Sequence, residues 1–484
     1  MDSVDVIIVG SGPNGMSAAV TLARAGLSVR VYEGESTIGG GARTSELTLP
    51  GFLHDVGSAV HPLALSSAFF RRFELSKRVD FIVPAMSYAH PLSDGRAGLA
   101  WRDLDRTAAE LGTDGPRWRR LFGPLVRHSD ALNQFAMSPL LGVPEHPIIA
   151  ARFALRVLEH GISEGYSRFS GVTAPALLTG VSAHSVGRIP TLAGTAAGLV
   201  LATAAHDRGW PIAVGGSQSI IAALAADFIA HGGEIVTGTR VRSLEELPRA
   251  RAVILNTSPR AAARLAAGRL PFAYRQQLES FRYGNAVAKV DFALSGAVPW
   301  RNPRLAEAGT VHLGGTRAEL ASAAAHVAAG RHPQRPYVVL SQPTVFDATR
   351  APQGKHVLWA YTPVPANSTE DRTDAIVRTI EAQAPGFRDL ILASTSTSAV
   401  EIENFNPNFI GGDIASGEMS LRQVIGRPVL SHTPWQTPVQ GIYIASGSTA
   451  PGPGVHGLAG FFAACQVLSA EFGISSVPSL SIRA

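Results

Sequence analysis

Four residues near the start of the chain have the types and spacing needed to bind a dinucleotide. Gly10, Gly12 and Gly15 form a Gly-x-Gly-x-x-Gly motif, and Glu33 ends the next apolar run. The first glycine allows a tight turn, the second lets the backbone approach a pyrophosphate, and the third lets a helix pack closely. The Glu33 carboxylate can accept hydrogen bonds from a ribose. These residues alone are compatible with either NAD or FAD.

Two further glycine-rich segments are candidates for the same ligand. The segment Gly39-Gly40-Gly41-Ala42-Arg43-Thr44 suggests a loop around phosphate or flavin, with Arg43 as a charged clamp. Gly452, Gly454 and Gly457 repeat the first spacing, but no strand with a terminal acid follows them. We therefore expect the helix after Gly457 to direct its N-terminus at a flavin ring, where it stabilises negative charge.

Histidines are the first candidates for acid–base chemistry. His54, Asp55 and His61 lie close together in the sequence, where they line a cofactor or mark a polar turn. Their spacing does not fit a zinc site, and we expect no metal. His184 lies in the apolar segment 170–205, so it is either a hydrogen-bonded core residue or a pocket residue.

The apolar runs around the first motif predict the elements that position it. Val6–Val9 predicts a buried parallel strand, an Ala-rich helix follows as far as Gly26, which caps it, and Ser28–Glu33 predicts a second strand. Farther along, amphipathic helices in 101–170 form a cap over a pocket or rest on a lipid surface. The other main predictions are strands at 234–237, 252–255, 285–294, within 338–362 and at 441–447, and helices at 219–230, 369–383 and 458–470.

Composition limits the class of protein. The 484 residues exceed one simple core, and 45% hydrophobic against 16% charged residues favours a large interior or an apolar substrate cavity. The net charge of +5 comes from scattered arginines, so we expect no nucleic-acid partner. The single cysteine, Cys465, and a first strand too early for a signal peptide favour the cytoplasm. The uncharged run Ile189–Ala205 is short for a membrane span, and we expect a buried helix.

Together these motifs resemble the FAD-dependent amine oxidase and phytoene desaturase superfamily, most closely its bacterial phytoene dehydrogenase-related and pyridine nucleotide-disulfide oxidoreductase domain-containing protein 2-like members. Gly10–Glu33 resembles the FAD fingerprint of that family, Glu234–Val241 a strand whose valine contacts adenine, and Gly441–Gly460 the C-terminal FAD motif. The resemblance implies an α/β fold in which a Rossmann-type, glutathione reductase-like FAD-binding domain is interleaved with an α+β substrate domain bearing a mixed sheet and a helical cap. The implied FAD-binding domain spans 1–75, 211–282 and 400–484, and the substrate-binding domain spans 76–210 and 283–399, with the cap around 101–170.

The resemblance also implies functional residues. The strand that carries Lys289 is similar to the strand bearing the flavin-facing lysine of amine oxidases, which holds a water near flavin N5; a snorkelling or paired structural lysine is the alternative. We expect catalytic groups at Lys289, His184 and His61. Cys465 does not match the family's covalent flavin position, so we expect non-covalent FAD. The FAD contacts that we expect are Gly10, Gly12, Pro13, Asn14, Gly15, Glu33, Gly40, Gly41, Ala42, Arg43, His54, Ser58, Val241, Asn256, Gly447, Gly454 and Val455.

The sequence therefore predicts an FAD-dependent dehydrogenase or desaturase that moves a hydride from a C–H bond of an apolar or mixed organic substrate to flavin N5. Oxygen or a quinone is the expected electron acceptor, because no second dinucleotide motif is credible. A flavin-dependent isomerase and an FAD-stabilised scaffold stay open as alternatives, whereas amine oxidation is less favoured because the family's aromatic cage is not evident. The sequence also leaves open a membrane-surface contact through 115–160 and the oligomeric state.

Overall fold

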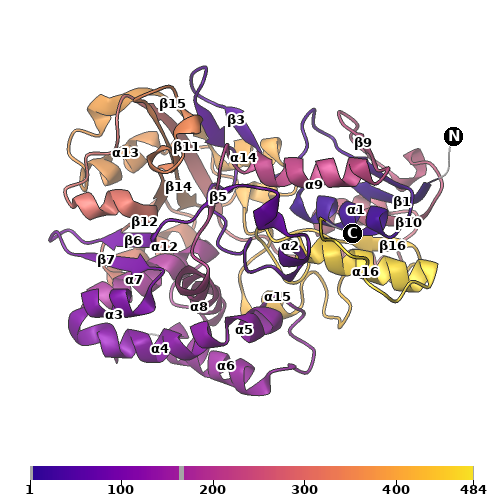
Figure 1. The fold of residues 1–484 in the computed structure, drawn as a ribbon, viewed down its shortest axis with the longest axis horizontal. Helices are drawn as coiled ribbons and strands as arrows, with labels where there is room; N and C mark the ends of the chain where they lie inside the picture. Colours follow the sequence, from indigo (N-terminus) through magenta and orange to yellow (C-terminus); the bar gives the residue numbers. More distant parts are fainter. Residues whose placement is uncertain (1–3, 163–167, 483–484) are drawn as a thin grey trace.

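The computed structural model describes residues 4–162 and 168–482 of the chain. The ends of the predicted FAD-binding domain (1–3 and 483–484) and one stretch of the predicted cap (163–167) lie outside the described residues. Two large sheets lie along the long axis of the molecule, and helices α3 to α6 gather below one of them (Figure 1).

The first large sheet is parallel and has the strand order β16-β10-β1-β2-β9. Alternate side chains of β1 pack into two different hydrophobic cores, because successive side chains in a strand point to opposite faces of the sheet. Val6 and Ile8 face one core, whereas Ile7 and Val9 face a second core that includes α10 (Pro259–Leu265) and α11 (Phe272–Glu279). The strands are β1 (Val4–Val9), β2 (Val29–Tyr32), β9 (Glu234–Val236), β10 (Ala250–Leu255) and β16 (Ile442–Ile444).

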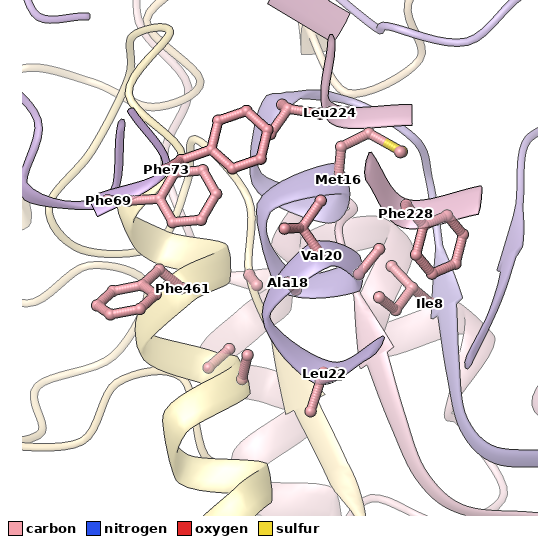
Figure 2. Close-up of a cluster of buried hydrophobic side chains, with 14 of the residues drawn as sticks. Ile8, Met16, Ala18, Val20, Leu22, Phe69, Phe73, Leu224, Phe228 and Phe461 are labelled. Atoms are coloured by element: carbon pink, nitrogen blue, oxygen red, sulfur yellow. The ribbon is translucent and has the colours of Figure 1, made fainter. Parts of the chain in front are cut away.

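Helix α1 (Pro13–Arg24) connects β1 to β2 and packs against α9 (Gln218–Ala230) and α16 (Leu458–Phe472). Figure 2 shows Val20 of α1 within this core, with Phe461 of α16 on one side and Phe228 of α9 on the other. A Cβ on Gly460 would lie only 1.7 Å from the Asn14 carbonyl oxygen. The absence of a side chain at Gly460 therefore allows α16 to cross close to the start of α1.

The second large sheet is mixed, with the strand order β15-β11-β14-β13-β12-β6-β7. All its neighbouring strands are antiparallel except β12 and β6. One face packs on α13 (Thr373–Glu381) through residues such as Val290 and Ile380, and part of the opposite face remains available to form a site. The strands are β6 (Met86–Pro91), β7 (Ala97–Trp101), β11 (Ala286–Leu294), β12 (Ala308–Leu313), β13 (Val338–Ser341), β14 (His356–Val364) and β15 (Ile391–Thr397).

A helical layer covers the β6–β7 end of this sheet and shares a core around Trp118 and Trp210. Helix α8 in this layer is largely buried, which confirms the buried helix expected for Ile189–Ala205. Within 4–162 and 168–482, no helix is both long and apolar enough to cross a bilayer. The layer contains α3 (Leu104–Glu110), α4 (Gly115–Arg127), α5 (Ser129–Ala136), α6 (Pro147–Gly161), α7 (Thr173–Ser182) and α8 (Leu192–Asp207).

Shorter elements join the two sheets. A hairpin of β3 (Thr44–Glu46) and β4 (Leu53–Asp55) and a pair of β5 (Phe81–Ile82) with β8 (Ile212–Ala213) both come from segments that connect the sheets. The remaining helices that bear on the argument are α2 (Ala68–Arg72), α12 (Arg317–Ala328), α14 (Ala399–Phe405) and α15 (Leu421–Ile425).

The predicted fold class is confirmed by the parallel sheet, the mixed sheet and the helices on their faces. The strand that the family resemblance implies over Glu234–Val241 is wrong beyond Val236. The chain turns at Gly238, whose φ is +65°, and the Thr239 N–H donates to the Glu33 carbonyl, so Val241 lies outside any strand. The domain boundaries stay a prediction.

Candidate active site and cofactor cavity

One large cavity, of about 1140 Å³, lies between the parallel sheet, the mixed sheet and the helical layer. At one end it meets the carboxyl ends of β1, β2, β10 and β16, where ligands bind in open parallel sheets. At the other end it meets the face of the mixed sheet opposite α13 and the apolar sides of α5, α6 and α8. Because the cavity connects the two sheets, it extends well beyond the residues of the glycine motif.

The first glycine motif forms the phosphate end through close backbone approaches. Gly10 has a φ of +99°, and a Cβ there would lie 2.8 Å from the Asn256 carbonyl oxygen. A Cβ on Gly15 would lie 2.0 Å from the Gly10 carbonyl oxygen, so only glycine lets α1 start this close to β1. Gly12 precedes α1 and, with Pro13 and Asn14, lines the cavity. The free N–H groups at this helix start suit an anion.

Glu33 lies at the end of β2 with its carboxylate already oriented. Its Oε2 accepts hydrogen bonds from the Ser11 N–H, at 2.9 Å, and from the Ser11 hydroxyl, and its Oε1 accepts from the Glu35 N–H at 3.0 Å. Glu33 lines the cavity beside Val241 and Arg240. A carboxylate oxygen has more than one acceptor site, so Glu33 retains capacity to bind a ribose hydroxyl.

Arg43 and the glycines before it form a loop at the middle of the cavity. The Arg43 guanidinium donates to the carbonyls of Gly40, at 3.0 Å, and Phe405, at 3.1 Å, and stacks 3.8 Å from the Phe405 ring centre. Burial lowers the pKa of Arg43, although Glu33 acts in the opposite direction. Gly40, Gly41 and Arg43 all line the cavity. Because protein carbonyls take up part of the guanidinium, its role as a phosphate clamp stays a prediction.

The C-terminal glycines reach the cavity through a loop. Gly447, Gly454 and Val455 line it, whereas Leu458, the first residue of α16, does not. The Leu458 N–H donates to Nδ1 of His456 at 3.1 Å. The loop before α16 therefore forms the wall here, and the expectation that the α16 N-terminus points at a flavin ring stays a prediction.

Residues of one strand register form the wall at the mixed sheet. Lys289 on β11 lies opposite Tyr361 on β14 and Thr397 on β15, and Tyr361 lies opposite Val339 on β13. All four line the cavity, and Trp359, two residues from Tyr361, lines it as well. Alternation along each strand places these side chains on the same face.

Lys289 belongs to a buried group of charges beneath this wall. Its Nζ donates to the Asp291 carboxylate and, at 2.9 Å, to the Asp55 carbonyl oxygen. The Asp55 carboxylate pairs with Arg350 at 2.8 Å. Burial lowers the pKa of Lys289 and raises that of Asp291, each toward its neutral form, and their mutual attraction opposes both shifts. Lys289 is thus a paired lysine that also lines the cavity, and its role as a flavin-facing lysine stays a prediction.

Two of the predicted histidines also line the cavity. His61 Nε2 lies 3.0 Å from the Ser217 hydroxyl, and burial lowers its pKa to about 4. His184 Nε2 lies 2.8 Å from His312 Nε2, and burial lowers the pKa of His184 to about 4. Both imidazoles are therefore neutral at pH 7. His184 is both hydrogen-bonded and a pocket residue, so the two alternatives hold together.

The cavity brings together most of the predicted site residues and leaves out three of them. Gly15, Ala42 and His54 do not line it. Gly15 packs against Gly10, at the end of β1, and Ala42 belongs to the hydrophobic core that includes α1. His54 lies behind the cavity wall, with its Nε2 2.8 Å from the Thr48 hydroxyl. The lining residues among those predicted are Gly10, Gly12, Pro13, Asn14, Glu33, Gly40, Gly41, Arg43, Ser58, His61, His184, Val241, Asn256, Lys289, Gly447, Gly454 and Val455.

Sequence reasoning missed Asp291, Trp359 and Tyr361. Asp291 has a visible signal, because it follows Lys289 by two residues in an apolar strand and so shares its face. Trp359 and Tyr361 likewise alternate within the strand of 356–364. What the sequence does not contain is the pairing of this strand with β11.

The residues present fit the FAD that the family resemblance implies. Glu33 would hold the adenosine, the start of α1 would hold the pyrophosphate, and the wall that includes Lys289 would hold the ring. Two polar atoms near the nucleotide end, Asn14 Oδ1 and Thr257 Oγ1, are buried and have no hydrogen-bond partner among the residues that the structure describes. Such atoms are costly unless a ligand or water satisfies them. Within the described residues, no cluster of three or more His, Cys, Asp or Glu side chains suits a metal ion.

Comparisons with known proteins identify the family of this chain and confirm its fold. Residues 14–468 match the family described as flavin containing amine oxidoreductase. The chain is 26% identical, over 94% of its length and 92% of the relative's, to pyridine nucleotide-disulfide oxidoreductase domain-containing protein 2 of Rattus norvegicus. It is 28% identical to 4,4'-diapophytoene desaturase of a Methylomonas species, over 28% of this chain and 30% of that one. The structure resembles cyclohexylamine oxidase from Brevibacterium oxydans, with a TM-score of 0.59 at 18% identity over 98% and 99% of the two chains.

Proposed function

The chain belongs to the flavin containing amine oxidoreductase family, and on that premise we propose that it is a dehydrogenase or desaturase of an apolar or mixed organic substrate. The chain is an FAD-dependent oxidoreductase, as the family is. Bound FAD supplies the chemistry by accepting a hydride from a C–H bond of the substrate. The contribution of the protein is to bind, orient and dehydrate the reactants, and to hold or move a proton.

The apolar lining of the cavity carries the proposal about substrate class. Helices α5, α6 and α8 contribute side chains without charge to the part of the cavity that lies away from the parallel sheet. The acidic residues among the described cavity residues are Glu33 and Glu35, both just after β2. A cationic substrate at the mixed sheet thus has no carboxylate partner in the cavity wall, whereas an uncharged hydrocarbon loses nothing there. The apolar residues of this wall are Phe135, Ala136, Met137, Leu140, Phe153, Ala154, Val157, Leu158, Leu192, Ala193, Ala196, Ala197, Val200 and Leu201.

The polar groups opposite this wall suit the loss of a proton that accompanies hydride removal. Lys289 lines the cavity and its Nζ is hydrogen-bonded to Asp291, so this group can hold or accept a proton at a fixed position. His61 and His184 are neutral near pH 7 and add acceptor or donor atoms at the same cavity. We propose that Lys289 is the proton-handling group and that the two histidines orient the substrate or a water.

Amine oxidation is a second candidate because of one observation. Trp359 and Tyr361 lie with ring centres 5.2 Å apart, and both line the cavity near Lys289. Aromatic faces bind cations, so these two rings offer an amine an alternative to a carboxylate. A flavin-dependent isomerase uses the same residues without net transfer of electrons, and stoichiometry separates it from the main proposal.

Helix α6 has an exposed apolar face that shares Leu158 with the cavity lining, which supports contact with a lipid surface. Leu158 of α6 is 53% exposed and also lines the cavity. Ile148 and Leu155 lie on the same helix at helical spacing and are 74% and 64% exposed. Exposed apolar patches of this kind mark interaction sites. We propose that an apolar substrate enters here from a membrane surface.

The electron acceptor and the cellular location of the protein are proposed from the sequence, and the cavity residues give no reason to alter either proposal. Gly454 of the second glycine motif lines the same cavity as the first motif, so oxygen or a quinone is a better acceptor than a second dinucleotide. FAD is proposed to be non-covalent, because Cys465 lies within α16 and not on the cavity wall. The single cysteine supports a cytoplasmic location.

Anaerobic mixing of the FAD-loaded protein with a panel of compounds tests the proposed function. The panel contains long-chain isoprenoids, other uncharged lipids and primary amines, and FAD absorbance and product mass are followed together. We expect bleaching of FAD with an uncharged substrate and a product lighter by two hydrogens. Bleaching with amines alone supports amine oxidation instead. A product of unchanged mass without bleaching indicates isomerisation, and no reaction with FAD that also resists photoreduction indicates a scaffold.

A further inference from the structure

A row of polar groups leads from the cavity wall to the outside of the molecule. Lys289 Nζ, on the wall, donates to Asp291 Oδ2. Asp291 Oδ1 lies 3.5 Å from His54 Nδ1. His54 Nε2 lies 2.8 Å from the hydroxyl of Thr48, which is half-buried in the loop between β3 and β4. The four side chains thus alternate donor and acceptor groups across the wall.

The middle of this row is fully buried and has two unpaired atoms that face each other. The side chains of Asp291 and His54 have 0% exposure. Asp291 Oδ1 and His54 Nδ1 have no hydrogen-bond partner among the described residues, and they are the two atoms separated by 3.5 Å. A buried carboxylate oxygen and a buried imidazole nitrogen are each costly to leave unpaired. A shift of a few tenths of an ångström joins them into a hydrogen bond, which closes the row.

The fold fixes each member of the row. Lys289 and Asp291 share one face of β11 because they are two residues apart. His54 belongs to β4, and its neighbour Asp55 points away to Arg350, which anchors the hairpin at 2.8 Å. The Asp55 carbonyl accepts the second hydrogen bond of Lys289. Hairpin and strand are therefore held together at this point by charged groups that are themselves buried.

We propose that Lys289, Asp291, His54 and Thr48 form a proton relay between the cavity and solvent. The relay rests on the proposed function, in which the substrate releases one proton as it gives up a hydride to FAD. That proton forms an N–H bond at Lys289 Nζ, and Nζ passes a proton to Asp291 Oδ2. The row starts with a neutral Lys289 amine and an Asp291 carboxyl that is protonated on Oδ1. As Oδ2 receives the proton from Nζ, Oδ1 delivers its own proton to His54 Nδ1. His54 Nε2–H then passes its proton to the Thr48 oxygen as the Thr48 hydroxyl proton passes to water. One proton enters and one leaves, and no electron moves along the row.

The charges around the row favour easy movement of the proton. Burial lowers the pKa of Lys289 and raises that of Asp291. The free energy of the charged pair, ammonium and carboxylate, therefore approaches that of the neutral pair, amine and carboxylic acid. Burial, together with the positive charges of Lys289 and Arg350, lowers the pKa of His54 to about 3. The imidazolium therefore forms only in passing. Asp55 on β4 opposes these positive charges, and Asp291 is the second acidic group beside His54.

The relay is tested by measuring proton uptake during photoreduction of the FAD-loaded protein. EDTA, a deazaflavin and light supply electrons under nitrogen, so no natural substrate is needed; absorbance follows FAD and an indicator dye follows protons. A relay works in both directions, so reduction draws protons inward along it.

Threonine variants at the outer end separate a relay from a structural role. Thr48→Val removes the hydroxyl and keeps the shape, Thr48→Ser restores the hydroxyl, and Thr379→Val on α13 is the matched control at another half-buried threonine. We expect proton uptake to lag behind FAD bleaching by about 10-fold or more in Thr48→Val and in Asp291→Asn, as for loss of positioned proton transfer. In wild type, Thr48→Ser and Thr379→Val the two signals keep pace.

The contrary results are distinct. Proton uptake that keeps pace with bleaching in Thr48→Val, or an equal lag in Thr48→Ser, overturns the relay while the proposed function stands. FAD that never accepts electrons in the wild type contradicts the proposed function, and the relay with it. If Asp291→Asn does not fold, the Thr48 pair still decides, because Thr48 lies at the half-buried end of the row.

Discussion

The two ends of the cavity are built on different principles. The nucleotide end consists mainly of backbone: close approaches at Gly10 and Gly15, the start of α1, and loops after strands of the parallel sheet. The end at the mixed sheet consists of side chains, with Lys289 and Asp291 buried as a pair and two neutral histidines nearby. Backbone geometry can hold a cofactor with little titration, whereas moving protons needs groups whose pKa values burial has shifted.

This difference decides which changes are tolerated at each end. At the nucleotide end a single added methyl group collides with backbone that cannot move away, so affinity and folding are affected together. At the mixed sheet a buried charge loses its partner, so the rate and the pH dependence change while the cofactor remains bound. The substitutions below are chosen to separate these two outcomes, from the largest expected effect to the smallest.

Gly15→Ala should have the largest effect. The new Cβ would lie 2.0 Å from the Gly10 carbonyl oxygen, so α1 must move away from the phosphate site. We expect a loss of about 3 kcal/mol, or roughly 100-fold in FAD affinity, measured by fluorescence titration of the apoprotein. Gly26→Ala is the matched control. The φ of +83° at Gly26 also strains an alanine, but a Cβ there would have no contact within 4 Å among the described residues beyond its chain neighbours, so FAD affinity should be kept. Equal losses in both variants would contradict a phosphate site at Gly15.

Lys289→Met should slow FAD reduction and leave FAD bound. The variant removes the proton-handling Nζ on the cavity wall, and loss of a positioned acid–base group costs about 100-fold or more in rate. Stopped-flow reduction by the substrate found in the panel measures the rate, and absorbance of bound FAD measures occupancy. Lys77→Met is the control, because Lys77 is an exposed partner of Glu74. Unchanged reduction would remove Lys289 from the reactive end.

Glu33→Ala should weaken FAD binding without changing the reduction rate of the bound fraction. The variant removes a carboxylate that is held by the Ser11 and Glu35 N–H groups and lines the cavity. Loss of a charge-assisted hydrogen bond costs about 1.5–3 kcal/mol, or roughly 10- to 100-fold in affinity. The control is Glu234→Ala, which removes an exposed carboxylate on β9 that pairs with Arg30 on β2; this variant should bind FAD normally. A slower reduction of bound FAD in Glu33→Ala would contradict the assignment of cofactor binding to one end of the cavity and of reactivity to the other.

Acid should destabilise the reactive end through two of its histidines, His61 and His184. Burial lowers the pKa of His61 and His184 in the folded state to about 4, from 6.5 when unfolded. Between these values the unfolded state binds more protons, so stability is complete above about pH 6.5 and falls as pH drops toward 4. His61→Gln should make the dependence of unfolding free energy on pH shallower by one proton, measured by denaturant unfolding from pH 7 to 4.5. An unchanged slope would place a charged His61 in the folded protein.

The sequence was informative where function depends on local spacing. The strand, glycine turn, helix and acid of Gly10–Glu33 lie within one supersecondary unit, so their geometry follows from the chain itself. Lys289 was also identified, because a lysine inside an apolar strand is unusual. Its partners were not all identified, because Asp55 lies 234 residues away in the sequence and reaches Lys289 only through the β3–β4 hairpin.

His54 and Val241 show why the rest was harder to predict. His54 adjoins residues that line the cavity, but strand alternation turns its side chain behind the wall, toward Asp291. Val241 does line the cavity, although the turn at Gly238 takes it out of the strand in which it was expected. Each outcome depends on one turn or one strand register, which tertiary contacts decide.

A crystal structure of the protein with FAD bound tests the central claim most directly, because the claim assigns one end of the cofactor to each end of the cavity. We expect the adenosine beside Glu33 and Val241, the pyrophosphate at the start of α1, and the flavin ring against the wall that carries Lys289. A flavin ring placed away from Lys289, or an FAD bound outside this cavity, would contradict the account.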